Sequence, residues 1–229
     1  MKLVLHIAGI ANVSHLEVER ALRLYVAQRA GKLVRLFEPE DDPYAVVVTE
    51  SPYSHTSVLF PPTFAKFQEA CAYLSKALLQ PVFAFSVPDT PFWMYSLYVD
   101  GHAVDRFNPR PAFWGDLPPG ERHSWRGNAA LVCEHWPRVE EADIEPYLIA
   151  WDRVLAVGRQ PKAHPEDMYP AGDAWQLFDF TDKLGLLCAV DNSESPLGHR
   201  YHLHFVGAYP DYRPRKPDAD DSRPWWKFW

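Results

Sequence analysis

The sequence predicts one α+β domain over residues 1–206, built mainly on an antiparallel sheet. The main observation is a hairpin over residues 92–108, in which apolar and polar side chains alternate on either side of Asp100-Gly101, a pair suited to the positive φ angles of a tight turn. The second is an apolar stripe at spacings of three and four within residues 62–80, which is typical of an amphipathic helix. No internal repeat or linker divides the chain, so we expect a single domain.

The first sixty residues predict one helix among several strands. Residues 2–10 are an apolar run, which indicates a buried strand. Ser14 and Glu17 have the spacing of a capping box, so we expect a helix over residues 14–30 that ends at Gly31. Three short strands are expected to follow, at residues 33–37, 45–49 and 57–60.

The helix over residues 62–80 leads directly into the strands of the sheet. Its predicted buried face consists of Phe64, Phe67, Cys71, Leu74 and Leu78. Residues 82–87 form an apolar run with small side chains on one side, which indicates a strand covered on both faces. In the first hairpin strand, one face is expected to carry Trp93, Tyr95, Leu97 and Val99.

The second half of the chain predicts two more helices, over residues 140–152 and 173–185. Both are expected to pack on the sheet through aromatic and leucine side chains. Residues 108–126, rich in proline, glycine and tryptophan, indicate a long loop that is either functional or held by aromatic packing. Residues 201–206 alternate as a further strand.

Composition and charge restrict the class of protein. The 229 residues are 47% apolar and 23% charged, which is typical of a folded domain with a substantial core. A formal net charge of −7 disfavours nucleic acids and anionic membranes as partners. The three cysteines are far apart, which predicts no disulfide framework and favours the reducing cytoplasm. The first apolar run is too short for a signal peptide, and no stretch reaches the length of a membrane span.

The sequence contains no GxxxxGK[ST], GxGxxG, GxSxG or HExxH motif, so we expect no cofactor. The best metal candidate is His199-x-x-His202-x-His204, in which His202 and His204 share one face of a strand and Asp191 or Glu194 could complete the ligand set. A metal-dependent hydrolase that uses these histidines is the alternative function. A half-exposed strand that is simply rich in histidine is the favoured interpretation.

A candidate ligand-binding region follows the hairpin. It comprises Asp105, Asn108, Arg110 and Trp114. Asp105 lies among aromatic residues, where an unpaired carboxyl group would have a raised pKa and could act as a general acid. A salt bridge from Asp105 to Arg106 or Arg110 is the structural alternative, and we favour it.

Residues 207–229 are predicted to form a proline-rich, charged tail that ends in four large aromatic side chains. These are Trp225, Trp226, Phe228 and Trp229, which we predict to bind a partner. No core position accounts for them, and exposed aromatic side chains of this size reduce solubility. Two alternatives remain open: the tail folds back into a groove of its own domain, or it inserts into a partner protein as a set of aromatic anchors.

Two blocks of sequence resemble a group of uncharacterised bacterial proteins. The first, WMYSLYVDGHAVDRFNP, runs from Trp93 to Pro109, and the second, GDAWQLFDF, runs from Gly172 to Phe180. The resemblance implies a bacterial, cytosolic origin and a framework of aromatic strands. No activity is attached to this group, so the resemblance assigns no functional residue.

Together these features predict a non-enzymatic protein-binding module of the bacterial cytoplasm, of an immunity or regulatory type. The absence of catalytic motifs argues for binding rather than catalysis. The negative net charge would steer a basic partner protein toward the domain.

Overall fold

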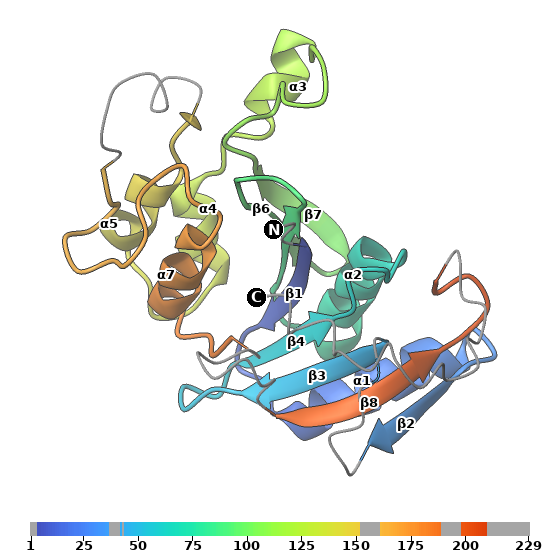
Figure 1. Ribbon diagram of the computed structural model, residues 1–229. Coiled ribbons are helices and arrows are strands. Elements are labelled where there is room, and N and C mark those ends of the chain that lie inside the picture. Colours follow the sequence, from blue (N-terminus) through green and yellow to red (C-terminus); the bar gives the residue numbers. More distant parts are fainter. Residues whose placement is uncertain (1–3, 37–41, 43, 152–160, 189–197, 210–229) are drawn as a thin grey trace, which may run out of the picture.

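The computed structural model has one antiparallel sheet as its main element, which confirms the predicted α+β class (Figure 1). The residues that it describes are 4–36, 42, 44–151, 161–188 and 198–209. In this part of the chain the sheet has eight strands, in the order β2-β8-β3-β4-β1-β5-β6-β7. The strands are β1 (Val4–Ile10), β2 (Lys32–Leu36), β3 (Ala45–Glu50), β4 (Thr56–Phe60), β5 (Val82–Pro88), β6 (Met94–Val99), β7 (His102–Phe107) and β8 (His199–His204).

Different sets of helices cover the two faces of the sheet (Figure 1). One face carries α1 (His15–Ala27) and α2 (Phe67–Leu78), and the other carries α4 (Ala129–His135), α5 (Glu141–Ile144), the 3-10 helix η1 (Glu145–Tyr147) and α7 (Gln176–Lys183). The short helix α3 (Pro119–His123) lies in the loop that follows β7.

Alternation along the strands separates two hydrophobic cores. In β5, Phe83 and Phe85 pack in the core beneath α4, α5 and α7, whereas Val82 and Ala84 pack in the core beneath α1 and α2. The same alternation in β1 and β4 keeps both faces apolar, because these strands lie in the middle of the sheet. We call the two cores the α7 core and the α2 core.

The hairpin of β6 and β7 forms as predicted. Asp100 and Gly101 have φ angles of 49° and 80°, which is the conformation of a two-residue primed turn. Tyr95 pairs with Phe107 in the ladder, and a bulge between Leu97 and Tyr98 shifts the register before the turn. The expected faces are also confirmed for Tyr95 and Leu97, which are both buried in the α7 core.

Two predicted helices are shorter in the structure than in the sequence analysis. The helix expected over residues 62–80 begins only at Phe67, because residues 61–66 form successive turns instead. The helix expected over 140–152 gives way after Ile144 to a 3-10 turn at Pro146, since proline has no N–H to donate and its ring clashes with the preceding helical turn.

The predicted strand at residues 201–206 is β8, and it spans His199–His204. It lies between β2 and β3, so the end of the described chain completes the sheet among strands from its beginning. The chain then turns toward the α2 core, where Ala208 and Tyr209 are buried. Residues 210–229 lie outside the described part of the chain.

Gly31 is required by a close approach of backbone rather than by the helix end that the sequence predicted. Ala30, not Gly31, takes the positive φ of 54° after α1. A Cβ atom on Gly31 would lie 2.2 Å from the carbonyl oxygen of His204 in β8. Glycine at this position therefore allows the turn after α1 to lie directly against β8, the strand that pairs with β2.

We expect Gly31→Ala to lower the free energy of unfolding by about 1–3 kcal/mol, because the added methyl group must displace backbone. Urea denaturation measures the change. The matched control is Gly120→Ala in α3, where a Cβ would meet no atom within 4 Å, and there we expect no loss of stability. Equal losses in the two variants would contradict this account of Gly31.

Candidate functional site

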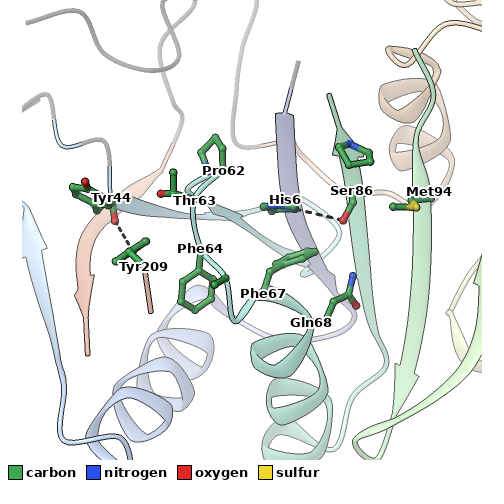
Figure 2. Close-up of a pocket in the computed structure, with 12 residues that line it drawn as sticks. His6, Tyr44, Pro62, Thr63, Phe64, Phe67, Gln68, Ser86, Met94 and Tyr209 are labelled. Atoms are coloured by element: carbon green, nitrogen blue, oxygen red, sulfur yellow. Dashed lines mark hydrogen bonds between the residues drawn. The ribbon is translucent and has the colours of Figure 1, made fainter. Parts of the chain in front are cut away.

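A groove of about 570 Å³ opens on the α2 side of the sheet, next to the segment that precedes α2 (Figure 2). We call it the α2 groove. Its strand residues are His6, Ser86, Pro88 and Met94. The segment before α2 and the start of α2 supply Pro62, Thr63, Phe64 and Phe67, and Tyr44 and Tyr209 close the end away from Met94.

Three of the strand residues of the groove come from one row across the sheet. His6 in β1 is opposite Ser86 in β5, and Ser86 is opposite Met94 in β6. Residues that are directly opposite in neighbouring strands project to the same face. The pairing register therefore places an imidazole, a hydroxyl group and a thioether side by side in the groove (Figure 2).

The late start of α2 creates the wall opposite this row. Because residues 61–66 turn rather than continue the helix, Pro62 and Thr63 stand above the sheet, and Phe64 and Phe67 point back toward it (Figure 2). Phe67 stacks on the imidazole of His6 with 4.7 Å between the ring centroids. The ring centroids of Phe64 and Tyr209 are 5.8 Å apart. Aromatic contacts therefore connect the segment before α2 to the Tyr209 end of the groove.

His6 is largely buried, and this burial lowers its pKa from 6.5 to about 4. A hydrogen bond with the backbone of Pro62 acts in the opposite direction but does not overcome the burial. A second polar contact of the ring joins Nδ1 to the hydroxyl oxygen of Ser86, 3.4 Å away. The imidazole is therefore neutral at pH 7 and contributes a polar but uncharged group to the groove.

The pairing of Ser86 with His6 has the composition of a nucleophile and a base, but its geometry favours recognition. The separation of 3.4 Å is longer than the hydrogen bond that activates a nucleophile. Ser86 is only 4% exposed, and an imidazole with a pKa of about 4 is a weak base. The pair is therefore better suited to forming hydrogen bonds with a ligand, as uncharged groups at the base of a mostly apolar groove.

None of the groove residues was predicted from the sequence to be functional. A usable signal is present nonetheless: His6 and Ser86 are polar residues within otherwise apolar, buried strand runs. A buried polar group must find a hydrogen-bond partner, so two such interruptions in neighbouring strands indicate a polar site between them. The pairing register that brings them together is not visible in the sequence.

Of the predicted ligand-binding residues, Asp105 lines a second hollow of about 490 Å³, between β7 and residues 123–131. Its Oδ2 atom accepts hydrogen bonds from the Tyr95 hydroxyl group (2.6 Å) and from the backbone N–H of Asn128 (3.0 Å). Burial raises the pKa of Asp105, and these two hydrogen bonds act against that rise. The carboxyl group thus ties the hairpin to the start of α4.

The structure does not bring the other three residues of that set to the hollow. The Asn108 side chain accepts a hydrogen bond from the backbone N–H of Arg110 (2.9 Å), which stabilises the turn after β7. The Arg110 guanidinium group lies over the ring of Phe113, 5.1 Å from its centroid. Trp114 is 58% exposed and contacts Phe92 with its ring edge. These contacts give the segment a structural role.

The three histidines of the metal candidate do not converge on one point. His202 and His204 share one face of β8, as predicted, but His199 lies on the opposite face, where its ring stacks on His15 at 4.5 Å. His202 is bonded instead to Asp42 at 2.6 Å, and this hydrogen bond raises the pKa of the imidazole. Across the described residues, no three histidine, cysteine, aspartate or glutamate side chains form a group that could hold a metal ion.

Several predicted residues fall outside the described part of the chain. They are Asp191 and Glu194, which were to complete the metal site, and the aromatic residues Trp225, Trp226, Phe228 and Trp229.

Comparison of the chain with protein-family models, with curated protein sequences and with solved structures finds no match. None of the described helices combines the length and the apolar character that a membrane span requires.

Proposed function

We propose that this chain is a non-enzymatic protein-binding module of the bacterial cytoplasm, of an immunity or regulatory type, and that the α2 groove receives an aromatic side chain from a segment of the bound protein. The observation that supports this most is the groove itself. It has the size of a ligand site, and it is lined mainly by aromatic and other apolar side chains above one neutral polar pair.

The lining suits an aromatic side chain with a single polar group. Phe67, Met94 and Tyr209 offer apolar surface to a ring, and methionine sulfur makes favourable contacts with aromatic rings. The Ser86 hydroxyl group and the neutral His6 ring could accept or donate one hydrogen bond. Tryptophan and tyrosine, which combine a large apolar body with one donor, fit this pattern best.

Charge and cysteine chemistry support the partner class and the compartment that we propose. The chain has a net charge of −7, which would speed association with a basic protein. Cys71 is fully buried in the α2 core, and burial raises its pKa well above the ordinary value, so it is an inert thiol. Free thiols of this kind suit a reducing cytoplasm.

Selection of peptides from a displayed library on the full chain tests the proposal. We expect the selected peptides to carry tryptophan or tyrosine next to basic residues. Synthetic copies should bind wild type and lose affinity at least tenfold with Met94→Arg, which places a charge in the groove. Fluorescence anisotropy of the labelled peptide gives the dissociation constant.

Two further variants make this test specific. Met168→Arg is the matched control and should bind like wild type, since Met168 is 69% exposed, does not line the groove and is hydrogen-bonded through its backbone to Asp179 of α7, on the other face of the sheet. Thr63→Arg changes an exposed residue at the rim and should weaken binding without loss of fold. Peptides that bind all four proteins equally would show that the α2 groove is not the binding site.

A further inference from the structure

We propose that the α2 groove has an occupant within the same chain, the aromatic segment of residues 224–229, which a partner must displace in order to bind. This inference rests on the proposed function, because it requires a groove that accepts aromatic side chains from a peptide segment. It adds a regulatory step: residues 224–229 occupy the groove in the free protein, and a partner binds by competing with them.

The described chain reaches residue 209 inside the groove itself. Tyr209 is 6% exposed and lines the groove, and its ring lies 4.7 Å from that of Tyr44 (Figure 2). Its hydroxyl group donates a hydrogen bond to the Tyr44 carbonyl oxygen (3.3 Å), and the carbonyl oxygen of Ala208 accepts one from the backbone N–H of Ala65 (3.0 Å). Tyr209, the last described residue before the aromatic segment, therefore lies in the groove.

The length of chain that follows is sufficient for return. Trp225 follows Tyr209 by sixteen positions, and a chain of that length spans at most about 50–60 Å when fully extended. A flexible chain of sixteen residues has an end-to-end distance of about 20–25 Å. Tyr209 itself lines the groove, so the aromatic side chains need to return only a short distance from it. Both chain lengths exceed that distance.

The chemistry of the segment matches the groove. Residues 224–229 have the sequence Pro-Trp-Trp-Lys-Phe-Trp, in which four of six side chains are large and aromatic. The groove presents aromatic and thioether surface from Phe64, Phe67 and Met94, with the hydroxyl group of Ser86 available to an indole N–H. If the segment did not bind the groove, both the apolar groove and the four aromatic side chains would be exposed to water, which is unfavourable.

Attachment makes even weak binding effective. A short flexible tether gives an effective concentration of about 1 mM. A segment that binds in trans with a dissociation constant of about 0.1 mM would then occupy the groove in roughly nine of ten molecules. Any competing peptide would bind about tenfold more weakly than its intrinsic affinity, since only the open fraction can accept it.

The experiment compares the full wild-type chain with a full-length variant that carries Trp225→Ser, Trp226→Ser, Phe228→Ser and Trp229→Ser. The probe is a labelled synthetic peptide of residues 222–229. We expect the four-serine variant to bind this peptide at least tenfold more tightly than wild type. Adding Met94→Arg or Thr63→Arg to the variant should abolish the gain, whereas adding Met168→Arg should preserve it.

Three results would overturn the inference: equal binding of the probe to wild type and to the four-serine variant, a gain that survives both groove substitutions, or a wild-type dimer that the four serines convert to a monomer. The last would place the segment in the groove of a second copy.

The library peptides separate this inference from the proposed function. If they bind the four-serine variant through the groove while the 222–229 peptide does not, the binding function stands and self-occupation is wrong.

Discussion

Phe180→Ala is expected to lower the free energy of unfolding by about 3–5 kcal/mol, the largest effect that we predict for a single substitution. Phe180 lies in α7 and is completely buried in the α7 core. Its ring meets five aromatic rings at centroid distances between 4.9 and 6.2 Å, from Phe83, Phe85, Trp93, Tyr95 and Tyr147. The substitution would leave a cavity between the sheet and η1 that the surrounding rigid rings cannot fill.

Chemical denaturation monitored by circular dichroism measures this loss. Phe113→Ala is the matched control, because Phe113 is 44% exposed and contacts only Phe92 and Trp114 among aromatic rings of the described residues, besides the Arg110 guanidinium group. We expect it to cost about 1 kcal/mol. If Phe180→Ala costs no more than Phe113→Ala, the aromatic cluster is not what fixes α7 to the sheet.

The second large effect concerns pH. Burial lowers the pKa of His6 in the folded protein from 6.5 to about 4, so the unfolded chain takes up a proton in a range where the folded chain does not. Stability is therefore lost as pH falls through the window from about 6.5 to 4, and the loss ends once both states are protonated. Between pH 7 and pH 4.5 this group alone should remove about 2.5 kcal/mol.

His6→Gln isolates this contribution, because glutamine can form hydrogen bonds but does not titrate. Urea denaturation at pH 7 and pH 4.5 should show a loss of stability for wild type that exceeds the loss for His6→Gln by about 2–3 kcal/mol. His102→Gln removes an exposed imidazole from β7 and should behave like wild type. Identical pH dependence in wild type and His6→Gln would mean that His6 is not held neutral beneath the groove.

Local patterns predicted the elements whose determinants are close in sequence. The Ser14–Glu17 capping box starts α1, and Asp100-Gly101 forms the turn of the hairpin, because each depends on a few adjacent residues. The position of β8 between β2 and β3 depends instead on pairing between residues more than 150 positions apart, such as Val34 with His202. No local pattern of residues indicates such a long-range pairing.

The candidate site was harder to predict than the fold for the same reason. The groove exists because His6, Ser86 and Met94 align across three strands and because α2 begins at Phe67 rather than near residue 62. Asp105 was recognised from the sequence because its surroundings are local to the hairpin. The sequence did not show whether its carboxyl group binds a ligand or connects the hairpin to α4. The histidine motif was similarly ambiguous, since strand alternation separates His199 from His202.

The central claim is that the α2 groove holds an aromatic side chain, and the methyl resonance of Met94 tests it most directly. The chain has only three methionines, so methyl-labelled protein gives a simple spectrum. On titration of the four-serine variant with a tryptophan-bearing peptide selected from the library, we expect the Met94 methyl signal to move upfield under the ring current of the bound indole. The signal of Met168, which is exposed, beside α7 and not part of the groove lining, should stay in place. Saturable binding of the peptide that leaves the Met94 signal unchanged would contradict the account.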